Sequence, residues 1–313
     1  MPTNQQARLS VIIPTWNAGP SFKELLKSLR GQTVTPAEII VIDSSSTDGT
    51  ADVARAEGAA VLSIPQTEFD HGGARNQAAA VATGDILIFM TQDALPADSL
   101  LLESLVRPLA AQEVAYAYAR QLPGEDANLL ERTARELNYP SESMLKSEHD
   151  IARMGIKAFF CSNVCSAIRR ETFERMGGFD SPVMFNEDLL LSARCMLQGG
   201  LIAYVAEAKV IHSHNFTLKQ LYRRFYDNGV SIGQHPWIAM RAKAEKAGSS
   251  IVRAQIAAVF KHRRFGLMVR LIAENACKYA GYKLGLRAGL KTGALEGVRK
   301  LDVSVAHKEG KVG

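Results

Sequence analysis

The chain has 313 residues, of which 47% are hydrophobic and 22% are charged, the composition of an ordinary globular protein. The first ten residues are polar, and no apolar run reaches the roughly 18 residues of a membrane-spanning helix, so we expect a cytoplasmic protein without a secretory signal. The four cysteines lack the paired spacing of a zinc site, which favours reduced thiols.

Charge is distributed unevenly along the chain. Residues 235–313 contain 16 Lys and Arg against 5 Asp and Glu, a net charge of +11, whereas residues 1–234 carry a net charge of −6. We therefore predict a main domain at 1–234 and a basic helical region at 235–313. The basic region favours a phospholipid surface or a lipid-linked pyrophosphate, unless its side chains simply face water. No motif that mixes aromatic and basic residues supports nucleic acid as the partner.

Short apolar strands alternate with helices at the start of the chain. Strands are predicted at 9–13, 38–42, 60–64 and 85–90, with helices between them at 21–31, 50–58 and 76–82. This alternation predicts right-handed βαβ units and a mostly parallel sheet. Ligands bind such sheets outside the carboxyl ends of the strands, and Asp43 and Asp93 both follow strand ends.

The rest of the chain is predicted to be more helical. Helices are expected at 100–109, 171–176, 187–198 and from 218 onward, helix and mobile loop at 125–153, and strands at 159–168, 202–206 and 209–212. Residues 264–278 form an amphipathic pattern, with Val269 and Ile272 on an apolar face and Arg270 and Lys278 on a polar, basic face. Such a helix either packs on the main domain or lies on a membrane.

Two aspartates at strand ends suit a nucleotide ligand. The ring N–H of a base needs an acceptor such as Asp43, and a diphosphate needs a divalent metal, which Asp93 could bind through hard oxygen. Each aspartate alone could equally cap its own loop, Asp43 by accepting from the backbone N–H of Ser45 or Ser46. Their position at one edge of the sheet favours the functional interpretation.

A second candidate segment runs from His71 to Asn76. Its glycine pair, Gly72 and Gly73, would let the backbone approach a ligand closely, and the helix that follows would favour phosphate oxygens at its start. Arg75 would supply a planar fork for a diphosphate. A glycine pair is also common in ordinary turns, so the segment gains its weight from Arg75 and His71.

Acidic and histidine residues in the second half complete the candidate chemistry. Glu187 and Asp188 open a helix after an apolar approach, which could raise the pKa of a carboxyl group toward that of a useful base. The simpler interpretation is that both acids complement the helix dipole. His212 and His214 share one face of a strand, so either could bind a metal or a phosphate.

Together these motifs resemble the family 2 inverting glycosyltransferases, which have the GT-A fold. The resemblance covers roughly the first three quarters of the chain and rests on residues 11–17, 41–50, 84–85, 91–94 and 186–188. Finer features are similar to the bacterial rhamnosyltransferases, and these are residues 69–76, 91–94, 212–214 and 222–229. The resemblance implies an α/β fold with a mostly parallel sheet flanked by helices, followed by a C-terminal helical extension.

The resemblance also implies roles for individual residues. Asp43 would hold a thymine or uracil ring, with Pro14, Thr15 and Asn17 around the nucleoside. The other donor-binding residues implied are Asp48, His71, Gly73, Arg75 and Gln92. Asp93 and His214 would bind a divalent Mg or Mn ion at the diphosphate. Asp188 would be the general base, with Glu187 beside it.

These roles predict one in-line displacement that inverts the anomeric centre. The donor would be dTDP-L-rhamnose and the acceptor a hydroxyl of a lipid-linked glycan in surface polysaccharide synthesis, which suggests a place at the inner face of the cytoplasmic membrane. The sequence departs from the family at Gln92-Asp93-Ala94, where the usual metal motif has two acids, and at Ser44, where many members carry a second acid.

Two alternatives remain beside this prediction, and a third is disfavoured. The donor could be a UDP-hexose, or the protein could bind a nucleotide sugar or glycan without catalysis. A dinucleotide-dependent oxidoreductase would need a G-x-G-x-x-G motif after its first strand, and Pro14-Thr15-Trp16-Asn17 stands there instead.

Overall fold

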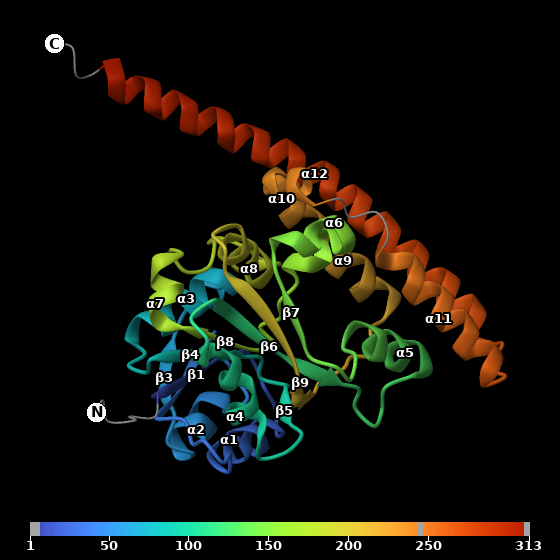
Figure 1. The fold of residues 1–313 in the computed structure, drawn as a ribbon, viewed down its shortest axis with the longest axis horizontal. Coiled ribbons are helices and arrows are strands. Elements are labelled where there is room, and N and C mark those ends of the chain that lie inside the picture. The colour runs from blue at the N-terminus through green and yellow to red at the C-terminus, as the bar shows by residue number, and fades with distance from the viewer. Residues whose placement is uncertain (1–6, 243–246, 310–313) are drawn as a thin grey trace.

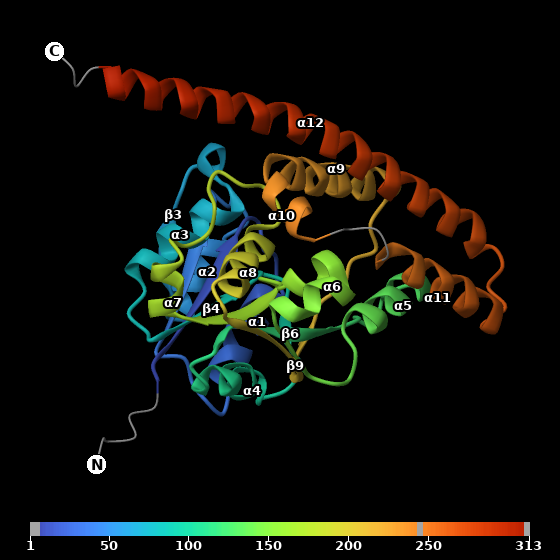
Figure 2. The same cartoon turned by 45° about the horizontal axis from the view of Figure 1, so that its top comes forward.

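One mixed sheet forms the centre of the molecule. The computed structural model describes residues 7–242 and 247–309, and within them nine strands join in the order β3-β2-β1-β4-β8-β6-β9-β5, with β7 paired to β9 (Figure 1). The α/β fold class predicted from the sequence is confirmed. The C-terminal helices lie beside the sheet body, as Figures 1 and 2 show.

The first half of the sheet is parallel and follows the predicted alternation. Its strands are β1 (Leu9–Thr15), β2 (Glu38–Asp43), β3 (Ala60–Ser63) and β4 (Ile86–Met90), and its helices are α1 (Phe22–Arg30), α2 (Thr50–Ala56) and α3 (His71–Val81). Thr15 pairs with Asp43, so the ends of β1 and β2 coincide. The helix predicted at 76–82 begins earlier, at His71, because Asp70 caps its start.

The second half of the sheet is partly antiparallel. It contains β5 (Leu95–Pro96), β6 (Val114–Leu122), β7 (Met144–Lys146), β8 (Cys165–Arg169) and β9 (Leu201–Ile211). β8 runs antiparallel between β4 and β6, while β6 and β9 are parallel. The strand predicted at 159–168 therefore begins only at Cys165, and the two strands predicted at 202–206 and 209–212 form one strand.

Two hydrophobic layers cover the two faces of the sheet. One face packs against α1, α2 and α4 (Leu101–Val106), and the other packs against α3, α7 (Arg170–Arg175) and α8 (Glu187–Leu197). Successive residues of β1 alternate between these layers, as a strand covered on both sides must. The remaining short elements are η1 (Gln66–Glu68), η2 (Arg107–Ala110), α5 (Leu129–Asn138), η3 (Glu148–Asp150), α6 (Ile151–Met154) and η4 (Gly155–Phe159).

Four helices follow the sheet. They are α9 (Leu218–Gln234), α10 (Pro236–Arg241), α11 (Ala247–Lys261) and α12 (Leu267–Glu309). α12 lies along α9, and α11 lies beside α5 (Figures 1 and 2). The α9–α12 contact crosses the predicted division between 234 and 235, which stays a prediction. Among the described residues, none of the helices combines the length and the apolar character that a membrane crossing requires.

Candidate active site

The loops after β1 and β2 are joined through Asp43. This residue is 3% exposed, and its carboxylate accepts hydrogen bonds from Thr15 Oγ1 at 2.9 Å and from the Ser46 backbone N at 2.9 Å. The alternative role raised from the sequence, a cap for its own loop, is therefore present. The contact with Thr15 goes further, because it fixes the end of β1 to the end of β2.

Asn17 and Asp48 continue the same rim. The Asn17 side-chain oxygen accepts from the Thr47 N at 2.8 Å, and Asn17 adopts a positive φ of 44°. Asp48 accepts from the Gly19 N at 3.0 Å and from the Thr50 N at 3.0 Å. The hydrogen bond from the Thr50 hydroxyl, outweighing the effect of burial, holds the pKa of Asp48 below its usual value. These bonds shape a polar rim at the carboxyl end of the sheet.

Gln92 attaches the loop after β4 to the same rim. Its side-chain amide accepts from the Trp16 N at 2.8 Å and donates to the Trp16 O at 3.2 Å. The Trp16 ring itself is 52% exposed beside the half-buried Pro14. Gln92 thus positions the rim backbone, and it leaves a flat indole surface open to a ligand.

Asp93 meets two histidines at the end of β9. The Asp93 carboxylate lies 3.5 Å from His212 Nε2 and 3.3 Å from His214 Nε2, and the two ring nitrogens are 3.1 Å apart. One ligand atom from each residue lies within 4.8 Å of the others. The sequence predicted Asp93 and His214 as ligands and left His212 open, and the structure brings all three together.

The charges of this cluster suit metal binding. Burial alone would raise the pKa of the Asp93 carboxyl, but the neighbouring His212 and His214 outweigh it and hold that pKa well below its ordinary value. Burial lowers the pKa of His212 below its ordinary value, although Asp93 opposes this effect. A carboxylate and a neutral imidazole are the forms that bind divalent metals.

Gln121 orients the imidazole of His212. Its Nδ1 lies 3.1 Å from the Gln121 side-chain oxygen, which also accepts from Arg135. Because arginine only donates, the Gln121 atom between them is the oxygen, and His212 Nδ1 must carry its proton. His212 Nε2 is then left with a lone pair toward Asp93, the arrangement found around metal-ligating histidines. Gln121 lies in β6, a strand absent from the sequence prediction.

Asp188 lies at the start of α8 with both oxygens bonded to backbone. Its carboxylate accepts from the Asn163 N at 3.0 Å and from the Leu189 N at 2.8 Å. Burial, followed by the negative charge of Glu187, nevertheless raises the pKa of Asp188 to about 7. A carboxyl group with such a pKa can accept a proton near neutral pH.

Glu187 and Arg75 form a buried ion pair. Arg75 Nη1 lies 3.4 Å from the Glu187 carboxylate, and the two side chains are 3% and 8% exposed. Arg75 also donates to the His71 carbonyl oxygen at 2.9 Å. The guanidinium predicted to face a diphosphate is thus turned into the protein. Burial would raise the pKa of Glu187, but Arg75 and His71 outweigh it and keep that pKa low.

The glycine pair before Arg75 has a packing role. A Cβ on Gly72 would overlap the Asp180 carbonyl oxygen, and a Cβ on Gly73 would overlap the Asp70 carboxylate. Asp70 accepts from the N–H groups of Gly72 and Gly73 at 3.0 and 2.8 Å. The amides expected to receive phosphate oxygens are therefore occupied by an aspartate cap, which corrects that expectation.

A chain of hydrogen bonds joins the cluster of Asp93, His212 and His214 to the pair of acids Glu187 and Asp188. The Gln121 amide donates to Ser162 Oγ at 2.9 Å, and the next residue, Asn163, binds Asp188 through its backbone N and Glu187 through its side chain. The Thr91 N donates to the Val164 O at 3.2 Å in the same loop. This loop leads into β8 beside the carboxyl end of β4. The two groups of residues therefore lie at the same end of the central strands.

Arg224 on α9 adds a cation that the residue patterns did not single out. Its guanidinium lies 4.8 Å from the centre of the Phe185 ring and 5.5 Å from that of Phe216, and the charge of Asp188 acts on it. Arg224 is solvent-exposed, and among the described residues it has no hydrogen bond or ion pair. An unpaired guanidinium held between two aromatic rings can receive an anion.

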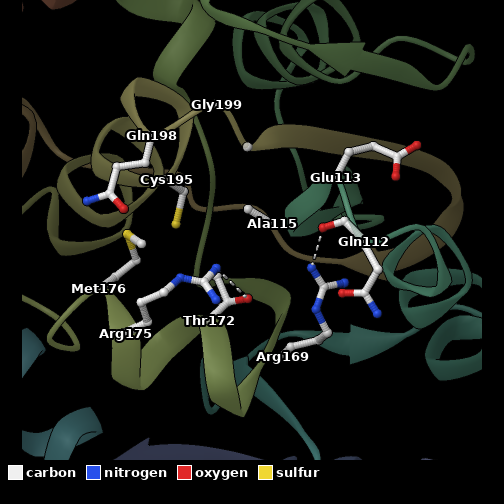
Figure 3. A pocket seen from close by; sticks show the side chains of 11 residues that line it. Gln112, Glu113, Ala115, Arg169, Thr172, Arg175, Met176, Cys195, Gln198 and Gly199 are labelled. Atoms are coloured by element: carbon white, nitrogen blue, oxygen red, sulfur yellow. Dashed lines mark hydrogen bonds between the residues drawn. The ribbon is translucent and has the colours of Figure 1, made fainter.

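A hollow at the opposite edge of the sheet is a separate feature. It encloses about 170 Å³, and Figure 3 shows Arg169, Arg175 and Cys195 on its wall. Arg169 there donates to backbone carbonyls, including those of Leu109 at 2.6 Å and Val114 at 2.8 Å. Its guanidinium is therefore a structural clamp.

The chain is similar in sequence or in fold to several known glycosyltransferases. The chain is 40% identical over 279 residues to the O-antigen chain rhamnosyltransferase WbaN of Salmonella anatum, covering 88% of each chain. It is 39% identical over 281 residues to RfbN of Salmonella typhimurium, with the same activity in its name and 89% of each chain covered. The mannosyltransferase PcManGT of Pyrobaculum calidifontis, solved with GDP-Man and Mn²⁺, has a TM-score of 0.60 at 20% identity, with 94% of this chain and 88% of that one covered.

The likeness to the mannosyltransferase concerns the fold, whereas the sequence likeness defines the family. The model of the family described as Glycosyl transferase family 2 matches residues 10–177, more than half of the chain. The matched segment contains the rim residues and Asp93, and the two Salmonella relatives extend the likeness over most of the chain. The protein is a glycosyltransferase, and the chain belongs to glycosyl transferase family 2.

Proposed function

We propose that the protein transfers L-rhamnose from dTDP-L-rhamnose to a hydroxyl of a lipid-linked glycan, with inversion, during synthesis of a surface polysaccharide. The names of the two Salmonella relatives support the sugar and the pathway class. The observation that carries the chemistry is Asp188, a carboxylate with a pKa of about 7 at the same sheet edge as the cluster of Asp93, His212 and His214.

Each group has a distinct part in the proposed displacement. Asp188 takes the proton of the acceptor hydroxyl as its oxygen attacks the anomeric carbon and the bond to the diphosphate breaks. Arg224 binds the departing diphosphate, the task that the sequence suggested for Arg75. Arg75 instead neutralises Glu187, so that only one of two adjacent acids needs to accept a proton.

The donor set at Asp93 fits a divalent metal. One carboxylate and two imidazoles, of which His212 has its tautomer fixed by Gln121, form a mixed oxygen and nitrogen set, which suits Mn²⁺ better than Mg²⁺, an ion that prefers oxygen ligands. When bound, such an ion neutralises charge on the leaving diphosphate. Asp93, His212 and His214 would hold it, and Gln121 would keep His212 in the binding tautomer.

The nucleoside would lie against the rim built by Thr15, Asn17 and Asp43. The open Trp16 ring beside Pro14 supports stacking, and Asp48 and Gln92 contribute by holding the rim backbone. His71 and Gly73 support the site from α3 by positioning Arg75 and the Asp70 cap. We also propose that the protein works at the inner face of the cytoplasmic membrane, where a lipid-linked acceptor would lie.

Replacement of Asp188 by Asn tests the proposed base. We expect the turnover number to fall by about 10²–10⁴, because the amide cannot take the proton, while donor binding stays within about twofold. Transfer from dTDP-L-rhamnose is measured with the lipid-linked acceptor, and donor binding by calorimetry. Asp52→Asn, an exposed acid on α2, is the matched control. Full turnover by Asp188→Asn would remove this residue from the reaction.

A donor panel tests the sugar independently. Thermal shifts with dTDP-L-rhamnose and several UDP-hexoses, each with and without Mn²⁺, should show the largest stabilisation with dTDP-L-rhamnose plus Mn²⁺. Stronger stabilisation by a UDP-hexose would keep the proposed base and replace the proposed donor.

A further inference from the structure

The long helix α12 presents an apolar stripe to solvent. Val269, Ile272 and Tyr279 are 75%, 66% and 67% exposed, and Phe265, just before the helix, is 56% exposed. Further along the same face, Leu290 is 48% exposed. From Val269 to Leu290 this face is about 31 Å long, at roughly 1.5 Å per helical residue, and Lys283 and Arg287 are exposed between Tyr279 and Leu290.

The side of α12 that faces the protein contains a buried acid, Glu274. Glu274 is 6% exposed and forms ion pairs with Arg270 at 2.8 Å and Lys278 at 3.5 Å. Arg270 also donates to the Phe216 backbone carbonyl at 3.3 Å. The same side also buries Leu271, which is 2% exposed, so the exposed stripe is a second apolar face of the helix.

Glycines hold α12 in this orientation. A Cβ on Gly285 would overlap the Tyr226 carbonyl oxygen, and a Cβ on Gly289 would overlap the Val230 carbonyl oxygen. The backbones of α9 and α12 therefore touch where these glycines lie, as in close packing between small residues. Rotation of α12 to bury its apolar stripe would drive bulky side chains into α9.

The surroundings of the stripe are strongly basic. Residues 250–293 contain nine Lys and Arg against one acid. Lys261, Arg263 and Arg264 are exposed where α11 meets α12, and Lys283, Arg287 and Lys291 are exposed along α12. A second copy docked through this face would bring two such basic surfaces together, whereas an anionic lipid surface would attract them.

We propose that this face of α12 is a docking surface for an anionic phospholipid bilayer. Val269, Ile272 and Tyr279 enter the boundary between headgroups and acyl chains, and the surrounding Lys and Arg side chains bind lipid phosphates. This inference names the surface for the membrane location within the proposed function and does not depend on which sugar is transferred. Figure 2 shows α12 across α9, on the side away from the sheet.

Vesicle binding by the full-length protein tests the proposal. Sedimentation is measured with equimolar phosphatidylglycerol and phosphatidylcholine vesicles, and with phosphatidylcholine alone. We expect binding to the anionic vesicles only. An apolar variant, Val269→Gln with Ile272→Gln, should bind at least about tenfold more weakly. Val81→Gln, which changes an exposed apolar residue at the end of α3, should bind like wild type.

A charge variant tests the second half of the proposal. Lys283→Gln, Arg287→Gln and Lys291→Gln together should weaken binding to anionic vesicles by about 100-fold, from roughly fivefold for each charge. Lys23→Gln, Lys27→Gln and Arg55→Gln on α1 and α2 form the matched control. The far-ultraviolet circular dichroism and Tm of every variant should equal those of wild type, so that lost binding does not reflect unfolding.

Several outcomes would overturn the proposal. If the apolar variant and its control bind vesicles equally, the lipid contact lies elsewhere on the protein. If the wild-type protein does not bind anionic vesicles, the proposed docking surface is wrong. A dimer in sedimentation velocity that the apolar variant dissociates would assign the stripe to a second copy. Donor hydrolysis is followed in the same samples, so that lost vesicle binding with retained hydrolysis contradicts only the docking surface.

Discussion

Asp188 and Glu187 are neighbours in sequence, yet their surroundings move the two pKa values in opposite directions. Burial and the charge of Glu187 raise the pKa of Asp188 to about 7. Glu187 is as well buried, but Arg75 and His71 keep its pKa low. The pair therefore separates into an ionised acid that is permanently paired and a second acid that can exchange a proton near neutral pH.

This arrangement predicts a pH-dependent stability. The folded-state pKa of Asp188 lies above its ordinary value, so its contribution to stability is present below about pH 4 and is lost as the pH rises through 7. The variant Asp188→Asn has no carboxyl group to ionise at this position, so it does not lose this stability as the pH rises. We expect the unfolding free energy of the variant, relative to that of wild type, to rise by up to about 3 kcal/mol between pH 5 and pH 8. Calorimetry at the two pH values measures it, and parallel wild-type and variant curves would contradict it.

Gln121 provides a test of the metal site that leaves its ligands intact. Replacement by Met removes the acceptor for His212 Nδ1, so the imidazole tautomer is no longer fixed. We expect Mn²⁺ binding to weaken about 10–100-fold, as for other outer-shell partners of ligating histidines. Titration calorimetry measures the affinity, and Gln112→Met at the opposite edge of the sheet is the control. Unchanged affinity in Gln121→Met would mean that the tautomer is fixed by another contact.

Single residues were predictable from the sequence where strand ends determine position. Asp43 and Asp93 follow apolar strands, so their common edge follows from the parallel alternation. The partner of Arg75 was not predictable, because Glu187 reaches it only after α3 and α8 pack on the same face of the sheet. Gln121 carried no local signal either, since its role depends on pairing between β6 and β9.

At the scale of elements, the parallel strands were predictable and the antiparallel part was less so. Residues 116–119 alternate Tyr and Ala, which suits a strand, but small alanines give a weak period-two signal. The start of β8 was placed too early, because apolar residues 159–161 lie in the core without belonging to the strand. A buried apolar run is therefore not always a strand, because irregular backbone can also lie in the core.

The contact between α9 and α12 can be tested through one glycine. Gly285→Ala places a Cβ against the Tyr226 carbonyl oxygen, so the two helices must move apart. We expect a loss of about 1–3 kcal/mol in unfolding free energy, measured by chemical denaturation. Gly266→Ala is the control, because a Cβ there meets open space. Equal stability of the two variants would show that the helices are less tightly held.

At the scale of the whole molecule, the predicted division after residue 234 passes between two helices in backbone contact. A chain ending at 234 would leave Gly229 and Gly233 of α9 without the helix that covers them. We expect this chain to have a lower Tm and slower sugar transfer than the full-length protein, because Arg224 lies on the helix that loses its support. Thermal unfolding and turnover measure both effects. Full activity in the shortened chain would establish 1–234 as an independent domain.

One helix, α9, has a consequence for how catalysis can respond to its surroundings. Its glycines touch α12, and its Arg224 guanidinium lies against the rings of Phe185 and Phe216. Because the two backbones touch at these glycines, a tilt of α12 would move α9 and Arg224 with it. Contact between α12 and a membrane would thereby be coupled to the position of the guanidinium proposed to bind the diphosphate.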